Sequence, residues 1–200
     1  MSLGEYTFSF PIWVEFGNGK SGRTGDVIDT KGWDSALIVT DRGIRAAGIL
    51  DGVESSLAAA DIEYEIYDEV EPNPTTAMVH DALDALNAGG FDVVVAVGGG
   101  SVIDTAKCAT LLKTNSGELS EYEVTLPEDV TAGSIETHPH PLVTIPTTSG
   151  TGSEVDYWAV ITAPDREFKM AIGQPPLYPD GPYLGAEISL VDPELTASLP

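Results

Sequence analysis

Short apolar runs alternate with segments of helical periodicity along most of the chain. The runs at residues 36–40, 92–97 and 142–145 are apolar on both faces, as expected of strands buried in a parallel sheet. Segments with apolar residues at helical spacing lie between or after these runs, at residues 44–60, 75–87 and 101–112. This alternation predicts an α/β fold built on a parallel sheet.

Shorter strand-like segments flank this region. The alternation at residues 64–67 predicts a further strand, and residues 7–16 indicate one or two short strands interrupted by Pro11. Asp192 followed by Pro193 is typical of a helix start. Beyond Gly152, proline-rich loops separate segments that we expect to be short strands, at residues 158–162, 168–172 and 187–191.

The net charge narrows the classes of function. The chain has 32 acidic and 9 basic residues, and its formal net charge is −23. Such a field repels nucleic-acid backbones and anionic membrane surfaces, so we expect neither as a partner. The acidic residues are spread along the whole sequence, which favours a solvated acidic surface of the kind found in proteins adapted to molar salt.

The cysteine content and the apolar segments bear on the compartment. Cys108 is the one cysteine, which excludes an internal disulfide framework and favours a reducing cytoplasm. It lies in a predicted helix, where we expect a small core residue. The longest apolar run within a predicted strand, residues 93–97, is too short to span a bilayer. No basic segment precedes the apolar N-terminal residues, as a signal peptide would require.

Three glycines, residues 98–100, lie between the strand at 92–97 and the next predicted helix. Glycine lets backbone amides approach an anion closely, and the helix start adds its dipole. Ser101 and Asp104 have the spacing of a capping box. The loop is not a dinucleotide fingerprint, because Ile103 stands where the third glycine belongs, and it is not a P-loop, because Lys107 does not follow a glycine. The sequence predicts an anion site here; the alternative is a tight turn that binds nothing.

Two other predicted strand ends carry polar side chains. Asp41 follows the strand at 36–40, where its carboxylate could accept ribose hydroxyls and repel a 2′-phosphate, or else cap the next helix. Residues 146–154 follow the strand at 142–145 and contain five hydroxyl groups, with Thr151 and Glu154 spaced as a second capping box. A solvated loop is the alternative there. Because the carboxyl ends of parallel strands meet at one edge, both segments are expected to face the glycine loop.

Other polar residues give weaker signals. Lys169 stands out among nine cations, although a surface position is the simpler interpretation without other support. Asn73 lies between two prolines and either offers a rigid side chain to a ligand or shapes a turn. His80, His138 and His140 do not combine with carboxylates at the helical spacing of a metal site, so no metal ligand set is predicted in this chain.

Several of these motifs together resemble a known family. Residues 98–107 and 146–155 resemble the two signatures of the iron-containing (group III) alcohol dehydrogenases. Segments 36–41, 72–75 and 192–200 agree with the same family in order and spacing. The resemblance implies a Rossmann-like parallel-sheet domain of the dehydroquinate-synthase-like type, which binds NAD and covers residues 1–192. Residues 193–200 would then begin the first helix of an all-helical metal and substrate domain that is absent from this chain.

The resemblance also implies a set of cofactor contacts. Asp41 would meet the adenosine ribose and favour NAD over NADP. The residues that would surround the pyrophosphate and its neighbourhood are Asn73, Gly99, Gly100 and Ser101, and those that would line the rest of the cofactor cleft are Thr147, Thr148, Thr151, Val160 and Lys169. The chain departs from the family at Asp156, where a hydroxyl residue is common in relatives.

The implied function is the cofactor-binding part of an NAD-dependent, metal-dependent alcohol dehydrogenase, which transfers hydride between a small alcohol or aldehyde and nicotinamide. Its divalent metal, iron or zinc, would bind an aspartate and three histidines beyond Pro200, so we expect no catalytic residue in this chain and no turnover by the chain alone. A non-catalytic, stand-alone nucleotide-binding module and a glycerol or polyol dehydrogenase of the same superfamily are the alternatives. A domain separated from its partner exposes an apolar face, which favours a homo-oligomer.

Overall fold

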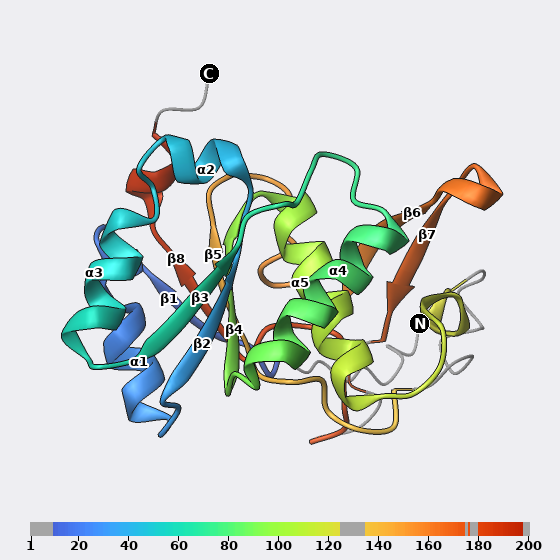
Figure 1. Ribbon diagram of the computed structural model, residues 1–200, viewed down its shortest axis with the longest axis horizontal. Coiled ribbons are helices and arrows are strands. Elements are labelled where there is room, and N and C mark those ends of the chain that lie inside the picture. Colours follow the sequence, from blue (N-terminus) through green and yellow to red (C-terminus); the bar gives the residue numbers. More distant parts are fainter. Residues whose placement is uncertain (1–9, 125–134, 175, 177–179, 198–200) are drawn as a thin grey trace, which may run out of the picture.

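The computed structural model describes residues 10–124, 135–174, 176 and 180–197. Its centre is a six-stranded sheet in the order β1-β8-β5-β4-β2-β3 (Figure 1). All neighbouring strands in this sheet are parallel, which confirms the predicted fold class. The strands are β1 (Trp13–Phe16), β2 (Ser35–Val39), β3 (Glu63–Tyr67), β4 (Val93–Gly98), β5 (Leu142–Pro146) and β8 (Ile188–Val191).

Helices cover both faces of this sheet (Figure 1). Ile38 of β2 packs in one core cluster with Ile28 and Leu57, whereas its neighbour Leu37 packs in a second cluster with Leu86. This alternation puts α1 and α3 on one face and α4 and α5 on the other, so the strands are buried on both sides. The helices are α1 (Thr24–Thr30), α2 (Arg42–Ala46), α3 (Asp51–Ala59), α4 (Thr76–Gly89) and α5 (Gly100–Thr114).

A separate antiparallel hairpin, β6 (Trp158–Ala163) and β7 (Phe168–Gly173), packs beside α4 and α5. Cys108 of α5 is fully buried in a third core cluster with Ile161 and Met170 of the hairpin. Burial raises the pKa of this thiol, in agreement with the predicted role as a core residue. The three strands expected beyond Gly152 are confirmed, and β8 is the one that joins the main sheet.

The single helix expected over residues 44–60 is wrong. The segment forms two short helices, α2 and α3, and Gly48 between them has a positive φ of 72°. That left-handed conformation ends α2 and turns the chain towards α3. The segment after Asp192 is a 3₁₀ helix, Pro193–Thr196, in which the Asp192 carboxylate accepts a hydrogen bond from the amide of Glu194, as expected of a cap.

The remaining short elements are 3₁₀ helices at Lys20–Arg23, Leu119–Tyr122 and Pro164–Arg166. Parts of the sequence predictions lie outside the described residues: residues 7–9 of the first strand segment, residues 175 and 177–179 of the proline-rich loops, and residues 198–200 after the last helix start. In the part of the chain that the structure describes, no helix is long and apolar enough to cross a membrane.

Candidate functional site

The order of the strands opens a crevice at the carboxyl ends of β2 and β4. The chain leaves β2 towards β3 at one edge of the sheet and leaves β4 towards β5 in the opposite direction, with α3 and α5 on opposite faces. Such a reversal is where open α/β sheets bind ligands. A cleft of about 550 Å³ lies there. Its lining includes Asp41, the segments 68–72 and 99–102, Thr147, Thr148 and Leu195.

The glycine loop forms the start of α5 and one wall of the cleft. Gly99 is the N-cap residue in an extended conformation, and no side chain caps the helix there. The amides of Gly100 and Ser101 are therefore among the first of the helix, which have no intrahelical acceptor. No acidic residue lies in the first turn of this fifteen-residue helix, although the chain is strongly acidic. A Cβ at Gly99 would lie 2.9 Å from Oγ1 of Thr148, so glycine here lets two walls of the cleft approach each other.

The capping box expected for Ser101 and Asp104 is wrong. The helix begins two residues earlier than that prediction requires, with Gly99 rather than Ser101 as its cap. Asp104 instead accepts a hydrogen bond at Oδ2 from the amide of Val160, at 2.9 Å. The side chain of Asp104 is 9% exposed, and burial raises the pKa of its carboxyl group.

Asp41 caps α2 and also lines the cleft. Its Oδ1 atom accepts a hydrogen bond from the amide of Ile44 at 2.9 Å, which confirms the capping alternative of the sequence analysis. The same residue borders the cleft opposite Gly99 and Gly100, at the carboxyl end of β2. Capping does not exclude a ribose contact, because a carboxylate has two oxygens and about four lone-pair sites.

Three further carboxylates, from Asp68, Glu69 and Glu71, line the cleft after β3. Asp68 forms an ion pair with Arg45 at 2.6 Å, and Glu69 forms one with Arg42. The hydrogen bond that each arginine donates to its carboxylate, followed by the charge of that carboxylate, raises the pKa of the arginine. The sequence analysis missed this rim, because acidic residues occur throughout the chain and these have no motif. Among the described residues that line the cleft, Arg42 is the one cation, so the rim keeps a net negative charge.

The loop after β5 forms the third wall. The amide of Thr147 donates to the carbonyl of Gly98 at 3.0 Å, which joins the ends of β5 and β4, and both Thr147 and Thr148 line the cleft. The second capping box is wrong, because the segment after Thr151 forms a turn at residues 153–155 rather than the first turn of a helix. Thr151 does not line the cleft, although a Cβ at Gly100 would lie 3.5 Å from its Cβ.

Three predicted cofactor residues, Asn73, Val160 and Lys169, lie beside the cleft rather than in its lining. Lys169 Nζ donates to Oδ1 of Asn73 at 2.7 Å, and Asn73 has a positive φ of 60°. The amide of Thr162 donates to the carbonyl of Pro74 at 2.8 Å, so the β6–β7 hairpin lies against the loop before α4. Val160 on β6 is 45% exposed. The structure therefore brings six of the ten predicted residues together in the cleft and places these three on an adjoining wall.

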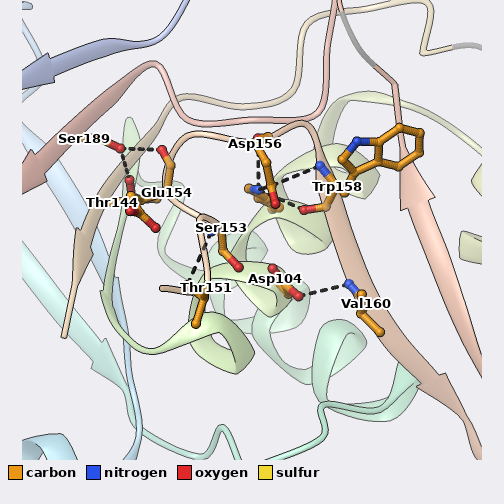
Figure 2. A network of polar contacts seen from close by, with 10 residues as sticks. Asp104, Thr144, Thr151, Ser153, Glu154, Asp156, Trp158, Val160 and Ser189 are labelled. Carbon is orange, nitrogen blue, oxygen red and sulfur yellow. Dashed lines mark hydrogen bonds and ion pairs between the residues drawn. The ribbon is translucent and has the colours of Figure 1, made fainter. Parts of the chain in front are cut away.

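Lys107 is the main residue that the sequence analysis missed. It belongs to α5, and its side chain is fully buried. Its Nζ pairs with Oδ1 of Asp156 at 2.5 Å and donates to the carbonyl of Trp158 at 2.8 Å. Figure 2 shows Asp156, Trp158, Asp104 and Val160 gathered beside α5. The partners of Lys107 are about 50 positions away in the sequence, and no local signal connects them.

Within the described ranges, no three His, Cys, Asp or Glu side chains form a group that could hold a metal ion. His80 is exposed on α4. His138 and His140 line a different hollow, together with Tyr183, near the amino end of β5 and away from the cleft. Burial lowers the pKa of His140.

Comparison with known proteins identifies the family. Residues 11–193 match the iron-containing alcohol dehydrogenases. The choline dehydrogenase of Bacillus subtilis is 40% identical over 195 residues, which are 98% of this chain and 46% of that protein. The chain thus spans about half the length of the curated relatives it matches.

Solved structures agree with this assignment. The NADH-dependent butanol dehydrogenase A of Thermotoga maritima superimposes with a TM-score of 0.84 and 28% sequence identity, over 98% of this chain and 46% of that one. The sulfoacetaldehyde reductase of Bifidobacterium kashiwanohense, in complex with NAD⁺, gives a TM-score of 0.80 at 26% identity, over 98% of this chain and 48% of that one. On the family match and the shared fold, this chain belongs to the iron-containing alcohol dehydrogenase family.

Proposed function

We propose that this chain is the NAD-binding part of a metal-dependent alcohol dehydrogenase, which transfers hydride between an alcohol or aldehyde and nicotinamide. The observation that carries the proposal is the cleft at the ends of β2, β4 and β5, with Asp41 on one side and the first amides of α5 on the other. When NAD is bound, its nicotinamide ring supplies the hydride chemistry, and the protein supplies binding and orientation.

The cleft residues fit two groups in the adenosine diphosphate half of a dinucleotide, the pyrophosphate and the adenosine ribose. The amides of Gly100 and Ser101, at the positive end of the α5 dipole, would hold the pyrophosphate. Asp41 would accept hydrogen bonds from the adenosine ribose, and its charge would disfavour the 2′-phosphate of NADP. The ion pairs of Arg42 and Arg45 with the rim carboxylates reduce the repulsion that a pyrophosphate meets there.

The nicotinamide half would extend towards the β6–β7 hairpin. The start of α5 lies between the cleft and this hairpin, so a dinucleotide bound at Gly99 and Gly100 continues towards Val160 and Lys169. Asn73 would hold the Lys169 ammonium in place through the hydrogen bond between them. Thr151, beside Gly100, would border the same path.

Metal and substrate sites would come from outside these residues. The chain covers 46% of the choline dehydrogenase it matches, and the described residues contain no metal ligand group. An iron or zinc ion in the remaining part would polarise the substrate oxygen as a Lewis acid. We therefore expect the 200-residue chain alone to bind NAD without turning over any alcohol.

We also propose that the protein works in the cytoplasm of an organism that accumulates salt. The charge of −23 on 200 residues, spread along the chain, supports this. A fold with this much self-repulsion gains from screening, so its stability should rise with KCl concentration. Equal free energies of unfolding in dilute buffer and in molar KCl would contradict the proposal.

Titration with NADH and with NADPH, followed by nicotinamide fluorescence in molar KCl, tests the proposed function. We expect saturable NADH binding at a stoichiometry of one, with NADPH clearly weaker because of Asp41. ADP should compete with NADH, because it occupies the same half of the cleft. Absence of NADH binding, or equal binding of the two cofactors, would overturn the proposal.

A further inference from the structure

Lys107 is the largest fully buried side chain of the described residues. Its ammonium group has three acceptors: Oδ1 of Asp156 at 2.5 Å, the carbonyl of Asp156 at 3.1 Å and the carbonyl of Trp158 at 2.8 Å. A lysine has three N–H donors, so this arrangement uses all of them. Burial of a charge is costly unless the charge is paired and hydrogen-bonded. All three acceptors that stabilise the buried ammonium of Lys107 belong to the segment that begins at Asp156.

Asp104 lies one turn before Lys107 on the same helix and holds the same segment. Its Oδ2 accepts a hydrogen bond from the amide of Val160 at 2.9 Å (Figure 2). The two side chains of α5 thus bind the backbone at residues 156, 158 and 160, which are alternate positions. Asp156 Oδ1 also accepts a hydrogen bond from the amide of Trp158 at 3.1 Å, so a bond within the segment adds to those that hold it against α5.

The segment held in this way is one wall of the proposed nicotinamide site. Val160 belongs to it directly, and Thr162 of the same strand pairs with Lys169 of β7 in the antiparallel register. The amide of Thr162 also binds the carbonyl of Pro74, which joins the strand to the loop that contains Asn73. A shift of residues 156–160 relative to α5 would therefore move the whole wall.

The same helix also provides the opposite side of the site, because Gly99 and Gly100 at its start line the cleft. We propose that Lys107 is a positioning residue, which fixes the distance between the start of α5 and the wall that carries Val160 and Lys169. This role rests on the proposed function. It extends that function, because Lys107 would affect the binding of the nicotinamide half of the cofactor alone. The cleft that we assign to the adenosine diphosphate half has no residue of this wall in its lining, so we expect Lys107 not to affect that half.

This division allows a direct test with two ligands. Lys107→Met keeps an unbranched apolar stem and removes the ammonium, and Lys113→Met removes a lysine from the exposed side of the same helix, where Nζ binds Asn87. We expect Lys107→Met to weaken NADH binding by about tenfold or more, because a misplaced wall loses its fit to the nicotinamide ring. Its affinity for ADP should stay within about twofold of the unaltered chain. Lys113→Met should change neither affinity.

The outcomes separate the inference from the proposed function. If the unaltered chain binds ADP but not NADH, the proposed function fails, and the role of Lys107 fails with it. If the unaltered chain binds NADH and Lys107→Met weakens both ligands equally, or neither, only the positioning role is overturned. Near-UV circular dichroism without ligand establishes that each variant is folded.

A second variant covers the case in which Lys107→Met does not fold. Asp156→Asn keeps an oxygen that can accept from Lys107 and removes the carboxylate charge, on a side chain that is 37% exposed. We expect it to weaken NADH binding less than Lys107→Met and to leave ADP binding unchanged. If neither variant folds, Lys107 supports the whole fold rather than one wall of the site, and the inference is wrong.

Discussion

Replacement of Asp41 by asparagine separates the two roles of this residue. An asparagine caps helices as well as aspartate does, so the hydrogen bond from the amide of Ile44, 2.9 Å long in the structure, is retained. The carboxylate charge at the carboxyl end of β2 is lost. Stability should therefore change little, whereas the choice between NAD and NADP should change measurably.

The expected size follows from the charge of the 2′-phosphate. At about 5 Å, two unit charges repel by roughly 1 to 3 kcal/mol when the effective dielectric constant lies between about 80 and 20. Each ~1.4 kcal/mol is a factor of ten in affinity. NADH also loses a hydrogen bond to a charged acceptor, which contributes about 1.5 to 3 kcal/mol. We expect the ratio of NADPH to NADH affinity to rise at least about tenfold in Asp41→Asn.

Parallel fluorescence titrations with the two cofactors measure this ratio, and urea unfolding checks the cap. The matched control is Asp29→Asn, which removes an exposed carboxylate from α1 that does not line the cleft. An unchanged ratio in Asp41→Asn would mean that Asp41 only caps α2. An equal rise in Asp29→Asn would mean that the overall charge, rather than the position of Asp41, decides the preference.

Three other outcomes are expected. NADH affinity should rise as KCl increases from about 0.1 M to about 1 M, because the Debye length falls from about 10 to 3 Å and the acidic rim repels the pyrophosphate less; a falling affinity in the same titration would contradict this. Asp192 is 1% exposed, and although burial alone would raise its pKa, hydrogen bonds from Ser21 and from the backbone lower it. The ionised Asp192 carboxylate therefore stabilises the fold fully above the unfolded-state pKa of about 4, and this stabilisation is lost as pH falls through the lower folded-state pKa. Asp192→Asn should lower the free energy of unfolding by about 1 to 3 kcal/mol at pH 7, and should make that free energy depend less on pH in the acid range of a urea-unfolding series. Gly25→Ala places a Cβ 2.1 Å from the carbonyl oxygen of Ser56 and should destabilise by roughly 1 to 3 kcal/mol or more, whereas Gly22→Ala, which meets nothing within 4 Å, should be close to neutral in the same thermal melts.

The sheet could be predicted from the sequence because its central strands carry a strong, local signal. β2, β4 and β5 are short runs of apolar residues that need burial on both faces, and with helical segments between them they favour a parallel sheet covered by helices on both faces. The residues that follow their carboxyl ends then fall into one cleft by topology alone, as Asp41, Gly99 and Thr147 do. The edge strand β1 and its neighbour β8 carry weaker patterns, and their pairing has no signature in the sequence.

The wrong assignment of Asp104 and the missed burial of Lys107 have a common physical cause. Ser101 with Asp104, and Thr151 with Glu154, have the spacing of capping boxes. That spacing reflects only which backbone amides are nearby in the sequence, and not those that the fold brings close. In the folded protein, the Asp104 carboxylate instead accepts a hydrogen bond from the amide of Val160, which is 56 positions away in the sequence. Lys107 is the extreme case, since a lysine in a helix is ordinarily exposed, and only tertiary contacts place its partners around it. Polar groups that are satisfied by distant residues are therefore the part of this site that the sequence does not reveal.

The pairing of β1 with β8 has a consequence for how the protein is made. Trp13 pairs with Ile188, and the amide of Gly19 binds Asp192 across 173 positions of the chain. Contacts of such long range close large loops and form late in folding. During synthesis, the first strand must wait until residues 188–191 have left the ribosome before it can join the sheet. Until then the backbone of β1 has no partner strand, so newly made chains are prone to associate with one another until β8 arrives.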